Sequence, residues 1–243
     1  MSISKKILWT MLLLAMICAS AFAQVVTDFT NTKDSGLVQH GDFAIRNGVL
    51  ESYTGTAVNV TIPANLGITA ISRNAFGNNL VSVVIPEGVT TFSFRECYNL
   101  QSVTIPNTVT IIGDYAFHLT SVTSIVIPNS VTSIGDFAFY RCTSLTSVVI
   151  PNSVIRIRDR AFLDCTSLTS VTIPNSVISI GSWAFANSAS LTSITIPDTI
   201  TYIAPNAFSN CRNLRQVIVT QTGADTSYIR NYFRDYEIIF RKI

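Results

Sequence analysis

Four cysteines are the strongest candidates for chemistry in this sequence: Cys97, Cys142, Cys165 and Cys211. A cysteine can act as a nucleophile, bind a metal or form half of a disulfide. The fifth, Cys18, lies in the apolar N-terminal run; the even number that remains would suggest disulfides if the chain is exported. However, each of the four stands three residues before a recurrent leucine, where side chains are expected to face inward. We therefore expect buried free thiols, with a Cys142–Cys165 disulfide as the alternative, because these two should lie on neighbouring coils.

Other catalytic or metal-binding patterns are missing from the sequence. The two histidines, His40 and His118, are far apart, and no C-x-x-C pair accompanies them, so a zinc site is not expected. A nucleophilic pair of His118 with Cys97 or Cys142 is conceivable, but thiols that face a core are inert. No G-x-S-x-G, glycine-rich phosphate loop or H-E-x-x-H occurs. The sequence predicts a protein without catalysis, metal or cofactor.

The elements that position these residues are repeats of about 23 residues. The dipeptide Ile-Pro recurs at steps of 23, 20, 22, 23, 23 and 23 residues, beginning at Ile62, Ile85, Ile105, Ile127, Ile150, Ile173 and Ile196. Ala-Phe recurs in register with it, ending at Phe76, Phe117, Phe139, Phe162, Phe185 and Phe208, and Phe94 takes its place in the shortened second repeat. Columns in register at this period are typical of solenoids.

One repeat, residues 145–167, can be interpreted as one coil. Leu145, Val148 and Ile150 face inward from a short strand, which Pro151 ends because proline has no N–H for a ladder. Ala161 and Phe162 would fill the back, through a short helical turn or an extended segment. A single coil buries too little to be stable, so neighbouring coils must stack with their strands parallel.

The chain divides into five segments on this interpretation. Residues 1–23 are predicted to be a signal peptide, because Lys5 and Lys6 precede an apolar run and Ala21-Phe22-Ala23 forms a cleavage site. Alternatives are a membrane anchor, for which the run is too short, and a lipoprotein site at Cys18. Residues 24–40 are expected to be a flexible leader, 41–58 a hairpin cap with an Asn47-Gly48 turn, 59–220 the solenoid and 221–243 a C-terminal cap. No transmembrane segment is expected after cleavage.

Composition excludes nucleic acid as a partner. Charged residues are only 12% of the chain, with 16 basic and 14 acidic residues. Removal of Lys5 and Lys6 leaves 14 of each sign, so the mature chain is formally neutral. Binding to nucleic acid requires clustered basic side chains.

The repeat unit resembles the BspA-like leucine-rich repeat family. Residues 168–185, LTSVTIPNSVISIGSWAF, match its signature L-x-x-V-x-I-P-x-x-V-x-x-I-x-x-x-A-F-x-x-C, and the resemblance extends from about 57 to 220. It implies a leucine-rich repeat solenoid. It also implies an exported protein at the cell surface, in the periplasm or secreted, and in several members an adhesin that binds proteins or glycans of host matrix, host cells or other microbes. The alternative is a periplasmic or envelope scaffold without a foreign ligand.

Three surfaces are candidate binding sites. The strand face should present serines beside a second outward column that includes Thr104, Thr172 and Thr195. An edge column precedes the Ala-Phe pairs and comprises Tyr115, Phe137, Arg160 and Trp183. Arg156 and Arg158 flank inward-facing Ile157. Each surface has a structural alternative: a solvated strand face, aromatics that pack over the back of the coil, and arginines that only solubilise the chain beside Asp159 and Asp164.

Overall fold

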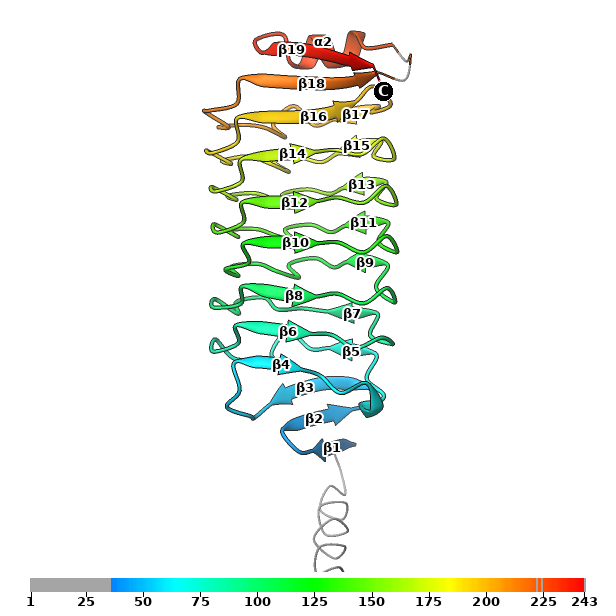
Figure 1. The fold of residues 1–243 in the computed structure, drawn as a ribbon, viewed down its shortest axis with the longest axis vertical. Helices are drawn as coiled ribbons and strands as arrows, with labels where there is room; N and C mark the ends of the chain where they lie inside the picture. Colours follow the sequence, from blue (N-terminus) through cyan, green and yellow to red (C-terminus); the bar gives the residue numbers. More distant parts are fainter. Residues whose placement is uncertain (1–35, 222, 224, 243) are drawn as a thin grey trace, which may run out of the picture.

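The computed structural model describes residues 36–221, 223 and 225–242, which form a solenoid of stacked coils with a cap at each end (Figure 1). The predicted signal peptide and residues 24–35 of the predicted leader lie outside the described residues. Residues 37–40, which we expected to belong to the leader, instead form a strand, β1 (Leu37–His40), that pairs with the first cap strand.

One face of the solenoid consists of short parallel strands, one from each coil. They are β4 (Asn59–Thr61), β6 (Ser82–Val84), β8 (Ser102–Thr104), β10 (Ser124–Val126), β12 (Ser147–Val149), β14 (Ser170–Thr172), β16 (Ser193–Pro197) and β18 (Gln216–Gln221). Equivalent residues pair in register, as Val126 does with Val149 and Thr172 with Thr195. The expected solenoid with one strand per coil is confirmed, and its strand register follows the sequence period.

A second face of two-residue strands follows the turn that begins at the recurrent proline of each coil. These strands are β5 (Ala70–Ile71), β7 (Thr91–Phe92), β9 (Ile111–Ile112), β11 (Ser133–Ile134), β13 (Arg156–Ile157), β15 (Ser179–Ile180) and β17 (Tyr202–Ile203). A short 3₁₀ turn, η1 (Ala64–Leu66), occurs in the first coil. Behind β11, β13 and β15 the backs of the coils are turns rather than a short helix.

Both faces are interrupted at the shortened repeats. Within the described residues, backbone ladders join β4 to β6 and β8, and β10 to β12 onward, but none joins β8 to β10 or β7 to β9. The sequence explains the position. Only Ser93 separates Phe92 from Phe94, whereas four residues separate Ile134 from Phe139. This coil is three residues shorter on the side of its second strand, where β7 and β9 fail to pair, although β6 and β8 still pair in register.

A continuous column of phenylalanine rings fills the interior. Ring centroids are 5.0 Å apart for Phe117 and Phe139, 4.9 Å for Phe139 and Phe162, and 5.1 Å for Phe162 and Phe185. The rings of the last two pairs are parallel to within 3°. The column includes Phe94, whose ring is 6.0 Å from Phe76 and 6.1 Å from Phe117. The predicted substitution of Phe94 for an Ala-Phe pair is therefore confirmed.

The phenylalanine peptides also join the coils by hydrogen bonds. The N–H of Phe139 donates to the carbonyl of Ala161 and that of Phe162 to Ala184, both at 2.7 Å. Ala161 and Ala184 are fully buried, so a larger side chain there would have no space. This explains why alanine and phenylalanine recur as a dipeptide.

The caps close the two ends of the stack. At the N-terminus, β1, β2 (Phe43–Arg46) and β3 (Val49–Tyr53) are antiparallel, and β3 joins β5. Asn47 and Gly48 have φ of 51° and 77°, as expected for the hairpin turn. At the C-terminus, α2 (Ser227–Tyr232) and β19 (Glu237–Lys242) cover the last coil, and Phe233 places its ring 5.6 Å from Phe208.

Replacement of Phe162 by alanine should destabilise the solenoid strongly. The ring is fully buried between two parallel rings, and truncation of such a residue typically costs about 3–5 kcal/mol. Urea unfolding followed by circular dichroism measures the change. Val149→Thr is the matched control, because Val149 is 64% exposed and its strand neighbour is already Thr172; we expect it to change the unfolding free energy by less than about 0.5 kcal/mol. If the two substitutions lowered the unfolding free energy equally, the phenylalanine column would not be a main source of the stability of the solenoid.

Candidate functional site

The four cysteines are buried free thiols, as expected, and the alternative Cys142–Cys165 disulfide is wrong. Each thiol lies close to the phenylalanine carbonyl of the preceding coil. The Cys142 Sγ donates to Phe117 O at 3.0 Å and the Cys165 Sγ to Phe139 O at 3.2 Å. Each of these two carbonyls also accepts a backbone N–H from its own coil, Thr120 N–H for Phe117 O and Cys142 N–H for Phe139 O, both at 3.1 Å, so the thiol is a second donor that links neighbouring coils.

Burial raises the pKa of every one of these thiols from the ordinary value of 9.0. The pKa rises to about 11 for Cys97 and Cys211 and to about 12 for Cys142. For Cys165, burial and then the neighbouring Cys142 raise the pKa well above the ordinary value. A protonated, enclosed thiol is a poor nucleophile. The four thiols therefore contribute to the packing of the coils, and none of them is an activated nucleophile.

His118 is buried beside aromatic rings rather than paired with a thiol. Its ring stacks on Tyr140 with centroids 4.9 Å apart, and its Nδ1 has no hydrogen-bond partner. Burial and then Arg95 lower its pKa, Glu96 raises it, and Arg141 lowers it further. The thiols of Cys97 and Cys142 donate to backbone carbonyls instead, which leaves the Cys–His nucleophile without support.

The edge column forms a closed stack of rings and guanidinium groups. Tyr115 and Phe137 lie with centroids 4.8 Å apart and planes within 6° of parallel. The guanidinium of Arg95 covers the outer face of this pair at Tyr115, 5.0 Å from the centroid, and that of Arg160 lies 5.2 Å from Phe137. All four side chains are half-buried. The faces of both rings are therefore already occupied, which favours the packing interpretation of this edge.

Trp183 stands apart from this stack. Among the described residues its indole makes no aromatic or cation–π contact, although Trp183 has the same left-handed backbone as Phe137 and Arg160, with φ near 60°. This conformation is rare for a residue with a side chain. At Phe137 and Arg160 the N–H of the left-handed residue donates to the next coil, to Asp159 O at 3.1 Å and to Ser182 O at 2.8 Å.

Arg156 and Arg158 differ in their surroundings. Arg158 reaches back over two coils, 3.7 Å from the carboxylate of Asp136 and 3.8 Å from that of Asp114. These partners differ from Asp159 and Asp164, the neighbours expected from the sequence. Arg156 is exposed on β13 and, in the described chain, forms no ion pair. Of these two arginines, therefore, Arg156 is the one that has no carboxylate partner among the described residues.

Two further columns, one of aspartates and one of Asp164 with asparagines, are structural. Asp114 Oδ1 accepts from the Asp136 N–H at 2.8 Å, and Asp159 Oδ1 accepts from the Ser182 N–H at 2.8 Å. In a second column, Asn187 donates to Asp164 at 2.6 Å. Sequence reasoning missed both columns, although their spacing of 22 or 23 residues could have revealed them.

The strand face, defined as the outward side chains of β4 to β18 on the first face, carries no charged residue. Thr104 and Thr172 are exposed on it and Thr195 is half-buried. Its most exposed apolar residues are neighbours in register: Val126 is 73% exposed and Val149 is 64% exposed. The two side chains together form a small apolar patch on an otherwise polar, uncharged face.

The interruption between β8 and β10 opens a groove in the strand face. Its volume is about 390 Å³, and Thr104, Asn107, Val126 and Pro128 are among the residues that line it. Val103, on the inward side of β8, is correspondingly only half-buried. The sequence located the irregular repeats but did not predict this groove.

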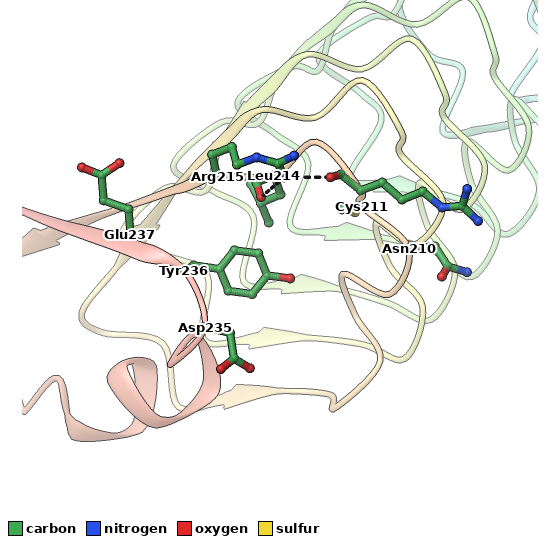
Figure 2. Close-up of a pocket in the computed structure, with 8 residues that line it drawn as sticks. Asn210, Cys211, Leu214, Arg215, Asp235, Tyr236 and Glu237 are labelled. Carbon is green, nitrogen blue, oxygen red and sulfur yellow. Dashed lines mark hydrogen bonds between the residues drawn. The ribbon is translucent and has the colours of Figure 1, made fainter.

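A larger recess lies at the C-terminal end, where no sequence motif pointed. Two hollows of about 610 and 660 Å³ share Asn210, Asp235 and Tyr236. Figure 2 shows the first of them, with the Tyr236 ring between the turn of Asn210 to Arg215 and the segment of Asp235 to Glu237. We call the two hollows together the C-terminal groove.

The described residues contain neither a metal-binding cluster nor a membrane-spanning helix. No group of three or more His, Cys, Asp or Glu side chains there could hold a metal ion. No helix in the described chain has the length and hydropathy needed to cross a bilayer.

Comparison with protein families gives one match over most of the chain. The model of the BspA type leucine-rich repeat region, with six copies, matches residues 44–144 and 132–236. No curated protein matches the chain.

Solved structures of similar fold come from several bacteria. A leucine-rich repeat protein of Bacteroides ovatus is 22% identical, with a TM-score of 0.51 over 84% of this chain and 67% of that one. A leucine-rich repeat protein of T. pallidum is 23% identical, with a TM-score of 0.50 over 88% of this chain and 99% of that one. At this identity the similarity concerns the fold.

The raised thiol pKa values predict that stability falls at alkaline pH. The folded state holds each thiol proton more tightly than the unfolded state does, so this contribution is complete below pH 9.0 and is lost as pH rises toward about 11 and about 12. Each buried thiol should contribute a slope of about 1.4 kcal/mol per pH unit in this window. Urea unfolding between pH 8 and 11 measures this slope, and Cys142→Ala should reduce it.

The four thiols should react with iodoacetamide only after the protein has been unfolded, because all four are buried in the folded state. Mass spectrometry of peptides from the treated protein identifies the modified cysteines. Labelling of Cys142 or Cys165 in the folded protein would contradict an enclosed column of thiols.

Proposed function

Because the chain belongs to the BspA-type leucine-rich repeat family, we propose that it is an exported binding module, an adhesin or recognition protein of the cell surface. The partner is a macromolecule of host matrix, host cells or other microbes, and the solenoid binds it without catalysis. The family fold supports a binding role, and the protonated thiols offer no nucleophile to a substrate. Export is supported by the sequence of residues 1–23.

The observation that carries this proposal is the exposed valine pair on an uncharged face. Val126 and Val149 are 73% and 64% exposed and lie in register on neighbouring strands. Burial of such side chains against a partner is favourable by about 25 cal/mol per Å² of apolar surface. The groove of about 390 Å³ beside Val126 gives a protein partner a place for an anchoring side chain.

The strand face is a better candidate than the aromatic edge. In the edge column, Tyr115 and Phe137 cover each other, and the guanidinium groups of Arg95 and Arg160 cover the remaining ring faces. A partner would have to break these contacts before it could stack on a ring. On the strand face, Val126 and Val149 are exposed and make no such contacts, so a partner can cover them without breaking an existing interaction.

The strand face should lose its partner when charge is placed at the valine pair. The double substitution Val126→Asp, Val149→Asp buries two unpaired carboxylates in any complex, and we expect binding to purified extracellular-matrix proteins to weaken by about tenfold or more. Surface plasmon resonance measures the affinity. Ile111→Asp is the matched control, because Ile111 is 52% exposed on the second face. If Ile111→Asp weakened binding equally, the strand face would not be the specific binding surface, and this proposal would be contradicted.

Location separates an adhesin from an envelope scaffold. Antibodies against the folded chain should label intact, unpermeabilised cells that express it. Signal that arises only after the outer layers are permeabilised would place the protein inside the envelope and favour the scaffold.

A further inference from the structure

The C-terminal groove has walls that are fixed before any ligand arrives. Phe233 is fully buried and continues the phenylalanine column, which docks the segment after α2. The Tyr228 hydroxyl accepts from the Ile203 N–H at 2.7 Å and lies 2.9 Å from the Ile203 carbonyl, to which it donates. The Tyr232 hydroxyl donates to Ala204 O at 2.8 Å. Tyrosine hydroxyls thus satisfy backbone groups of Ile203 and Ala204 at the free edge of the last coil, and a groove that is already fixed binds a ligand with a smaller ordering cost.

The groove is rich in tyrosine. Four of the eight tyrosines of the chain line it: Tyr202, Tyr228, Tyr232 and Tyr236. Tyr202 is 51% exposed and Tyr228 is 38% exposed, and neither ring stacks on another described aromatic side chain. Unlike the rings of the edge column, the rings of Tyr202 and Tyr228 have exposed surface that a ligand can contact. Tyrosine provides a large, rigid contact area that has both apolar and polar parts.

Polar groups with remaining hydrogen-bonding capacity surround the rings. The Asn210 Nδ2 donates to Asn187 Oδ1 at 2.9 Å. The Oδ1 of Asn210 is therefore still available as a hydrogen-bond acceptor. One guanidinium nitrogen of Arg215 is held by the carbonyls of Arg212 and Leu214 at 2.7 and 3.1 Å, which fixes the group and leaves its other N–H donors. The Tyr236 hydroxyl points into the hollow (Figure 2) and, among the described residues, has no hydrogen-bond partner.

The C-terminal groove is lined by both basic and acidic side chains, so its charge favours neither anions nor cations. Arg212, Arg215 and Arg234 are accompanied by Asp235 and Glu237. The aliphatic side chain that contributes to the first hollow, Leu214, is only 2% exposed. A strongly acidic, strongly basic or purely apolar ligand would therefore leave much of this surface unmatched.

We propose that the C-terminal groove binds a short neutral saccharide. A sugar ring has apolar C–H faces, which match the tyrosine rings, and a rim of hydroxyls, which match the amide, guanidinium and phenol groups. Sites for small ligands combine such apolar surfaces with a few placed polar groups in a hollow of about 300–1,000 Å³. This site lies at the C-terminal cap rather than on the uninterrupted strand face, so it would add glycan recognition to protein binding by the solenoid.

Isothermal titration calorimetry of the full chain with short linear oligosaccharides of glucose, galactose, mannose and N-acetylglucosamine tests the proposal. At least one should bind the wild type with a dissociation constant of about 1 mM or tighter. Tyr202→Ala should weaken that binding by about tenfold or more, and Tyr202→Phe, which keeps the ring, should retain most of it. Tyr98→Ala is the matched control, because Tyr98 is 45% exposed on another coil and does not line the groove.

Two results would overturn the saccharide site: no binding by the wild type to any of these sugars, or equal binding by Tyr202→Ala and wild type. The double variant Val126→Asp, Val149→Asp separates this proposal from the strand-face proposal. It should bind the saccharide as wild type does while losing the matrix protein, and Tyr202→Ala should do the reverse. Loss of saccharide binding in the strand-face variant would also contradict a separate groove.

Discussion

Each central coil relies on the coil after it to satisfy the N–H of one phenylalanine peptide. The N–H of Phe139 bonds to Ala161 O and its C=O accepts from the Cys165 thiol, at 2.7 and 3.2 Å. The rings of the same phenylalanines stack at about 5 Å along the interior. An unpaired buried peptide costs about 1–3 kcal/mol per group, so a coil cannot be removed from the stack without leaving such groups exposed or unsatisfied.

This interior arrangement determines what remains for binding. Alanine, phenylalanine and cysteine face inward, the aspartate columns bond the backbone of the next coil, and the edge aromatics stack on one another. Most side chains that could do chemistry are therefore committed to holding the coils together. The free surfaces are the uncharged strand face, the groove where two strands fail to pair, and the C-terminal groove, where the repeat ends and the cap begins.

The features that recur in every coil could be predicted from the sequence. The contacts between distant coils and the groove at the C-terminal end of the stack could not. The Ile-Pro and Ala-Phe periods predicted the solenoid and its register, and the position of the cysteines three before leucine predicted buried thiols. The edge column was found, but its closed stacking was not, because ring orientation depends on a left-handed backbone at Phe137. The pairing of Arg158 with Asp114 joins residues 44 positions apart, two coils away, and the C-terminal groove combines residues of the last coil with a cap that has no period.

Native-state hydrogen exchange tests most directly whether the phenylalanine peptides unite the coils. The amides of Phe117, Phe139, Phe162 and Phe185 each donate to the following coil at 2.7 or 2.8 Å. If the stack is one cooperative unit, their opening free energies should be nearly equal and close to that of global unfolding. Amides that exchange coil by coil, each with its own much lower opening energy, would contradict the account.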